Sequence, residues 1–321
     1  MEDLLLYLPF LVPAIVANLG ARERWARYVI YGLLVAINLG LLGIVVLALL
    51  LGFAQRFTPD VLGLAGPAVN WGGVALACFL TSALAFLPLI PAVRRWLARW
   101  LPIDPDSDVH TTALAFAVYQ IGLSLGQMAL IGDLENLANA KLALTIQDVV
   151  LTGVPLTLFA LVGVGFLTRR DARSTLERLG LRRPTWKQLI AAVVITALLL
   201  AFDVGVNLAW QEMDPAGYDL LERVTENLFG HLTTVGGGIA LGLSAGISEE
   251  LLFRGAVQPR LGLFVATVLF AIGHLQYGLT VVTLEIFIIG LVLGLLRNRT
   301  NTTVCIIVHA SYNALGMILG M

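Results

Sequence analysis

The sequence predicts an all-α, polytopic transmembrane helical bundle of about ten helices. Three observations predict it: the composition, the repeated long apolar runs, and the alternation of basic loops between those runs. Of the 321 residues, 58% are hydrophobic and only 13% are charged, and the mean hydropathy is +0.88. A soluble domain carries about 25% charged residues, and a soluble chain of this length could not bury so many apolar side chains.

The apolar runs supply the individual helices, since a helix of about 20 apolar residues crosses the hydrocarbon core. The chain opens with the acidic residues Glu2 and Asp3 rather than with basic ones, so the first run is expected to be a retained helix and not a signal peptide. Ten runs are long enough, at residues 4–20, 28–54, 71–93, 110–132, 145–167, 187–209, 233–257, 261–277, 279–296 and 302–320.

Basic residues are concentrated in every second loop. Positive charge marks the cytoplasmic side, so the odd-numbered loops are expected inside and both termini outside. The net charge of −1 gives no basic surface for a nucleic-acid partner. The basic residues of the odd loops are Arg22, Arg24, Arg27, Arg94, Arg95, Arg99, Arg169, Arg170, Arg173, Arg178, Arg182, Arg183, Lys187, Arg260, Arg297 and Arg299.

The most charged stretch, residues 168–187, divides the chain. We expect it to form an amphipathic surface helix followed by a turn at Arg183 and Pro184. Residues 1–167 form N-terminal transmembrane helices of unknown role. Residues 168–321 contain nearly all of the ionisable chemistry and are predicted to be the functional core.

The first motif of that core is Glu249-Glu250-x-x-x-Arg254. Ionisable groups at membrane depth cost about 2.5–3.5 kcal/mol each and are by default functional. On a helix, residues i and i+4 share a face, so Arg254 is predicted to pair with Glu250. Glu249 is rotated by about 100° and is left free for chemistry. The alternative is that these charges lie at the headgroup level of a helix end.

Two further motifs follow on separate helices. The eighth run contributes Phe270 and His274, with the ring one turn below the imidazole, and the last run contributes His309 and Asn313. By the rise of a helix, Glu249 is expected about 13 Å and His274 about 20 Å from the inner end of their helices. Each motif alone also fits a packed histidine or a polar contact between membrane helices.

Together these residue types support hydrolysis. A carboxylate and an imidazole can activate a water, and an imidazole and an amide can bind an oxyanion. Equally, Glu249, His274 and His309 form a common zinc-ligand set with an open water position. The residue types alone leave both mechanisms open.

The three motifs, in this order and spacing, resemble those of the CPBP family, which comprises the CAAX prenyl endopeptidases and the related bacterial Abi proteins. The resemblance covers about residues 170–320 and not the first five helices. It implies an intramembrane endopeptidase in which Glu249 and His274 activate the attacking water, and His309 and Asn313 stabilise the oxyanion. Glu250, Arg254 and Phe270 are then supporting residues. Members are described both as metalloproteases and as metal-free glutamate peptidases, and we favour the metal-free mechanism over zinc.

The expected partners are a peptide or membrane-anchored protein substrate and the lipid bilayer, in the cytoplasmic membrane of a prokaryote, with the site open to the cytoplasm. Two rival functions are a transporter that uses these groups as a proton relay and a non-catalytic scaffold of the same fold. Asp203 and Glu285 are further intramembrane acids, and Glu285 is a candidate for the cavity or the headgroup region.

A serine peptidase is a third rival, because residues 242–246 read Gly-x-Ser244-x-Gly. That motif needs a strand–turn–helix setting, whereas here it lies in an apolar helical run. Close packing of helices is the better explanation of the small residues, which are Gly236, Gly237, Gly238, Gly242 and Gly246.

Overall fold

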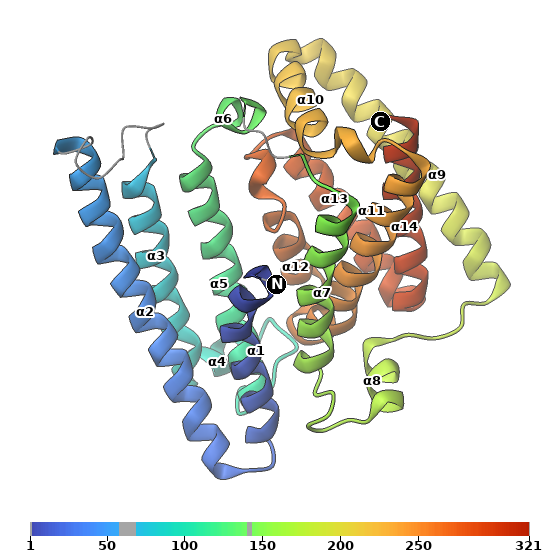
Figure 1. Cartoon of the computed structure of the whole chain (residues 1–321). Helices are drawn as coiled ribbons and strands as arrows, with labels where there is room; N and C mark the ends of the chain where they lie inside the picture. The colour runs from blue at the N-terminus through green and yellow to red at the C-terminus, as the bar shows by residue number, and fades with distance from the viewer. Residues whose placement is uncertain (1, 58–68, 140–142, 321) are drawn as a thin grey trace.

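The computed structural model describes residues 2–57, 69–139 and 143–320, and this part of the chain is helical, without named strands. Ten main helices form the bundle in Figure 1 and correspond in order to the ten predicted runs. They are α1 (Glu2–Gly20), α2 (Arg24–Phe57), α3 (Trp71–Phe86), α5 (Asp108–Ile131), α7 (Ile146–Gly163), α9 (Trp186–Met213), α11 (Val235–Glu250), α12 (Gln258–Ile272), α13 (Val281–Arg299) and α14 (Thr302–Leu319).

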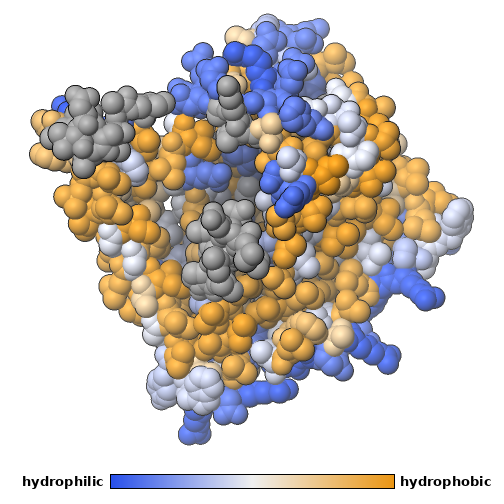
Figure 2. Space-filling view, in the orientation of Figure 1, coloured by the Kyte–Doolittle hydropathy of each residue, from blue (hydrophilic) through white to orange (hydrophobic). Residues whose placement is uncertain are grey.

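Eight helical stretches are long and apolar enough to cross a membrane, taking residues 235–272 as one stretch and leaving out α1, whose apolar part Phe10–Gly20 is shorter. Figure 2 shows an apolar band around the middle of the visible face, with hydrophilic residues at both ends. Large apolar side chains such as Leu50, Phe79 and Leu198 are at least half exposed, as expected where lipid replaces water. The predicted all-α polytopic bundle is confirmed, and the protein is an integral, multi-pass membrane protein.

The predicted basic loops lie together at one end of the bundle, the lower end in Figure 1. Hydrogen bonds join them: Arg22 Nη1 donates to Thr168 O (3.2 Å), Thr302 N donates to Gly180 O (3.0 Å), and Arg178 Nη1 donates to Gly255 O (3.2 Å). The loops that the sequence marks as basic therefore lie on one side of the molecule, as their alternation predicted.

Four further α-helices lie at the two ends of the bundle. The surface helix expected within residues 168–187 is α8 (Ala172–Leu179), capped by Asp171 and ended by Gly180 at φ +75°. The turn expected at Arg183 and Pro184 is wrong, because residues 181–185 have no assigned turn and lead directly into α9. At the opposite end, α10 (Pro215–Phe229) packs on α6 (Leu134–Asn139), and the sequence analysis had assigned neither. The fourth is α4 (Pro91–Leu97).

The chain reverses direction at Gly262. After α11 the helix widens into a π-helical stretch, Leu251–Val257, and continues into α12, where Gly262 has φ +85° and ψ 168°. The Arg254 guanidinium lies 4.3 Å from the Phe270 ring, whereas a continuous helix would separate the two residues by about 24 Å. A glycine is required here because other residues rarely adopt a positive φ.

This reversal brings the first two motifs to the same depth. Glu249 lies 13 residues before Gly262, and His274 lies 12 residues after it. The helical rise places them about 20 Å and about 18 Å from the turn. The unequal depths expected from the sequence resulted from taking a different inner end for each helix.

Glycines hold α11 against α14. A Cβ on Gly242 or Gly246 would lie less than 3.0 Å from atoms of Ala310, and one on Gly238 would meet Ile318. The packing prediction is wrong for Gly236, which faces open space, and Gly237 meets the preceding turn rather than a neighbouring helix.

The N-terminal helices pack directly on the predicted core. Ser244 Oγ donates to Val149 O on α7 (2.7 Å), and Gln120 Nε2 on α5 donates to Leu269 O on α12 (2.9 Å). The Ser244 hydroxyl thus bonds a backbone carbonyl of a neighbouring helix, which accounts for a small polar residue at this position without a nucleophilic role.

Candidate active site

Glu249 and His274 face each other across the hairpin that reverses at Gly262. Glu249 Oε2 lies 3.8 Å from His274 Nε2, and the two side chains are 16% and 24% exposed. That distance is too long for a direct hydrogen bond. Glu249 Oε2 makes no hydrogen bond to any described residue, so it keeps its full capacity to accept one.

A backbone contact fixes the tautomer of His274. Its Nδ1 lies 2.8 Å from Phe270 O, one turn earlier. A carbonyl oxygen can only accept, so Nδ1 carries the proton. In the neutral ring, Nε2 then presents its lone pair toward Glu249, as a proton acceptor must.

Glu250 belongs to a separate and fully buried network, the closed network, in which Glu250 Oε2 makes no hydrogen bond to a described residue. Its Oε1 lies 3.0 Å from Arg254 Nη1 and accepts a hydrogen bond from His309 Nδ1 at 2.9 Å. Arg254 Nη2 also donates to Gly290 O on α13 (3.0 Å). The Glu250 and Arg254 side chains are 0% and 2% exposed. This network links α11, α13 and α14. It is separate from Glu249 and His274, which we call the open pair.

The Phe270 ring separates the two halves of the site. It lies under the Arg254 guanidinium and contacts both imidazoles, with centroids 5.0 Å from His274 and 5.8 Å from His309. A guanidinium over an aromatic face is an attractive contact that strengthens on burial. Phe270 therefore holds the charged network and the open histidine in a fixed relation.

Asn313 lies one turn after His309 on α14 and is partly buried. No hydrogen bond joins its amide to another residue that the structure describes. The structure thus brings together Glu249, Glu250, Arg254, Phe270, His274 and His309, whereas no described hydrogen bond joins Asn313 to them.

A cavity of about 590 Å³ lies against the open pair. Glu249 and His274 line it, whereas Glu250, Arg254, His309 and Asn313 do not. Its opposite wall comes from the N-terminal half of the chain, through residues of α1, α5 and α7. These include Asn18, Phe116, Gln120, Thr152 and Phe159.

A zinc site would require three protein ligands arranged around one metal position. No group of three His, Cys, Asp or Glu side chains within the described ranges is placed to hold a metal ion. The hydrogen bond from His309 Nδ1 to Glu250 would leave Nε2 free for a metal, but the His309 ring does not line the cavity that Glu249 and His274 line. The residues as placed therefore do not fit the three-ligand zinc site.

The other intramembrane acids form a separate cluster. Asp203 Oδ1 accepts a hydrogen bond from Tyr312 Oη (3.2 Å). The Asp203 carboxyl group also interacts with that of Glu285, electrostatically and by a hydrogen bond. Glu285 is buried at 5% exposure and does not line the cavity. The cavity location considered from the sequence is therefore wrong for Glu285, whereas its location at headgroup depth stays a prediction.

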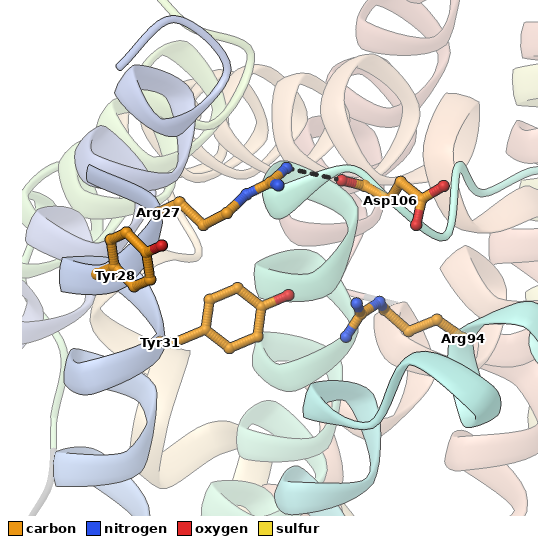
Figure 3. Close-up of a pocket in the computed structure, with 5 residues that line it drawn as sticks. All are labelled: Arg27, Tyr28, Tyr31, Arg94 and Asp106. Atoms are coloured by element: carbon orange, nitrogen blue, oxygen red, sulfur yellow. Dashed lines mark hydrogen bonds between the residues drawn. The ribbon is translucent and has the colours of Figure 1, made fainter. Parts of the chain in front are cut away.

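A second, smaller cavity of about 390 Å³ lies at the basic end (Figure 3). Arg27, Tyr28, Tyr31, Arg94 and Asp106 line it. Arg27 is paired with Asp108 at 3.1 Å, and Arg94 donates to the carbonyls of Pro88 and Pro105. Arg27 thus has a carboxylate partner, whereas Arg94 is bonded to backbone carbonyls.

The fold and the polar groups inside it define a helical membrane protein with a glutamate–histidine site. Comparison with protein families then gives a more specific result. Residues 231–315 match the family of type II CAAX prenyl endopeptidases, Rce1-like. The match contains all three motifs, so the resemblance expected from them is confirmed over this segment, which is about a quarter of the chain. No curated protein and no solved structure matches the chain.

Two features of the site escaped sequence reasoning. The Glu250–His309 hydrogen bond joins residues 59 positions apart, and nothing local indicates it. The cavity wall from α1, α5 and α7 was also missed. Gln120 and Asn18 were visible signals of it, because an amide in an apolar helix needs a buried partner.

Proposed function

We propose that the protein is an intramembrane endopeptidase of the CAAX-protease type, in which Glu249 and His274 activate a water that attacks a peptide bond. The observation that carries the proposal is the open pair itself. A carboxylate oxygen and an imidazole nitrogen, both acceptors, face each other at 3.8 Å on the wall of a cavity.

A water between these two atoms donates one hydrogen bond to Glu249 Oε2 and one to His274 Nε2. As the water oxygen attacks the carbonyl carbon, its proton passes to this pair. The pair then delivers a proton to the departing amine nitrogen, so that the two products are a carboxylic acid and an amine. General acid–base groups of this kind contribute about 10²–10⁴-fold in rate.

The closed network supports the open pair electrostatically. Arg254 and Glu250 cancel each other's charge, and His309 donates to the same carboxylate oxygen. Direct oxyanion contacts from His309 and Asn313 rest on the family resemblance alone, because neither residue lines the cavity.

The cavity extends from Glu249 and His274 to Arg260, near the end that carries the basic loops. By the positive-inside rule this end is cytoplasmic. We propose that a peptide or membrane-anchored protein substrate enters from that side, in the cytoplasmic membrane of a prokaryote.

The test is cleavage of a peptide library by the purified protein in proteoliposomes. Wild type is expected to cleave some members, and Glu249→Gln is expected to cleave none at a measurable rate. Glu285→Gln is the matched control, because it changes a buried intramembrane acid outside the cavity.

Two results would contradict the proposal. Equal cleavage by wild type and Glu249→Gln would exclude the glutamate mechanism, and an absence of cleavage by every variant would favour the scaffold. A third arm adds a chelator. Loss of activity that zinc restores would overturn the metal-free mechanism in favour of a zinc enzyme.

A further inference from the structure

Arg260 is a buried cation without a counter-ion. It is 7% exposed, lies two residues before Gly262, and lines the same cavity as Glu249 and His274. Its guanidinium donates to Ala256 O (3.0 Å) and Gly163 O (3.2 Å). Carbonyl oxygens satisfy donors but carry no net charge, and no carboxylate of the described residues lies within ion-pair distance of it.

The surroundings of Arg260 are also positive. Arg178, Arg170 and Arg169 all lie close enough to repel it electrostatically. Arg178 donates to Gly255 O, and burial, with Arg170 and Arg297 nearby, lowers the pKa of its guanidinium. Unpaired buried charges are costly, and proteins retain them where a ligand completes the pairing.

The distance from Arg260 to the open pair sets the size of that ligand. Helical side chains lean toward the N-terminus, and the bond to Ala256 O places the Arg260 guanidinium about one turn before its own Cα. The shorter Glu249 side chain leans less. The helical rise then gives a gap of about 13 Å between guanidinium and carboxylate, which is the length of about four extended residues.

We propose that Arg260 binds a carboxylate of the substrate about four residues from the scissile bond. This inference rests on the proposed peptidase function and adds a specificity-determining residue to it. The guanidinium has three further N–H donors beyond the two in use, enough for a paired contact with both carboxylate oxygens. The carboxylate is either the chain terminus of the substrate or an Asp or Glu side chain.

The experiment compares three versions of one cleavable peptide: with a free C-terminal carboxylate, with a C-terminal amide, and with its acidic side chain changed to an amide. Wild type is expected to prefer the peptide that keeps the relevant carboxylate by about tenfold or more in kcat/KM. Arg260→Gln is expected to lose this preference through KM while cleaving the amidated peptide as wild type does. Arg260→Lys is expected to recover part of it.

Arg94→Gln is the matched control. Arg94 is equally buried, is bonded to two carbonyls and lies in the separate cavity of Figure 3. It is expected to keep the preference of wild type. If Arg260→Gln slows carboxylate and amide peptides alike, or if wild type has no preference, the carboxylate site is excluded.

Binding of the same peptides to Glu249→Gln separates this inference from the peptidase proposal. Arg260-dependent binding without cleavage by wild type would support the carboxylate site and contradict the peptidase. Cleavage without any Arg260-dependent preference would contradict the carboxylate site alone. A last arm measures binding to vesicles of phosphatidylglycerol. If that binding depends on Arg260 and the binding of peptide carboxylates does not, the ligand is a lipid phosphate and the proposal is overturned.

Discussion

Glu249 and Glu250 are adjacent in the sequence and have opposite environments. Each keeps one oxygen without a hydrogen-bond partner among the described residues, but Glu249 lines a cavity and lies beside a histidine whose second nitrogen is anchored. Glu250 is fully buried between an arginine and another histidine. The helix causes the difference, since neighbouring side chains diverge by about 100°. One carboxylate is therefore available for chemistry, and the other holds three helices together.

The largest effect is expected at the open pair. Glu249→Gln and His274→Gln should each reduce kcat by about 10³-fold, and the double variant should be no slower than either single variant, because the two residues act on one water. Steady-state kinetics in proteoliposomes measure all three. Multiplicative losses would show that the two residues act in separate steps.

The next effect concerns the stability of the closed network. Arg254→Met leaves Glu250 as a buried carboxylate without its cation, which should lower the free energy of unfolding by about 3–5 kcal/mol. Denaturant or thermal unfolding in detergent measures this loss. Arg173→Met is the control, since its pair with Glu177 is fully exposed at the surface and is expected to contribute under 1 kcal/mol. Equal effects would show that burial of the network does not matter.

A smaller effect is expected at the contact that positions both networks. Gly246→Val places a side chain against Ala310 and should cost about 1–3 kcal/mol, with a loss of activity as α11 moves from α14. Gly236, the second residue of the same helix, faces open space, so Gly236→Ala should be neutral or slightly stabilising. Similar destabilisation by the two would contradict the close α11–α14 contact.

The smallest effect is expected at Ser244. Ser244→Ala removes one hydrogen bond to α7 and should cost about 0.5–1.5 kcal/mol of stability, while kcat stays unchanged. A loss of activity comparable to that of Glu249→Gln would revive the serine mechanism.

The features that depend on nearby residues could be predicted from the sequence. Helical spacing predicted that Glu250 pairs with Arg254 and that Glu249 points elsewhere, and the structure has both features. The apolar runs predicted the main helices, because the length of a span is set by the bilayer.

The remaining features depend on tertiary structure. An apolar helix that faces lipid and one that faces a cavity have similar sequences. The cavity wall formed by α1, α5 and α7 could therefore not be predicted. The location of Glu285 beside Asp203 depends on how α13 meets α9. Arg260 appeared only as a loop cation, since its lack of a counter-ion is visible only once its neighbours are known.

The most direct test measures both the rate and the thermal midpoint of two variants side by side, Glu249→Gln and Glu250→Gln. The account predicts that Glu249→Gln keeps the midpoint of wild type and loses cleavage, because its carboxylate has no structural partner. Glu250→Gln should instead lower the midpoint, because it weakens the contacts to Arg254 and His309. Cleavage by Glu249→Gln at the wild-type rate, or the same behaviour in both variants, would contradict the division of labour between the two glutamates.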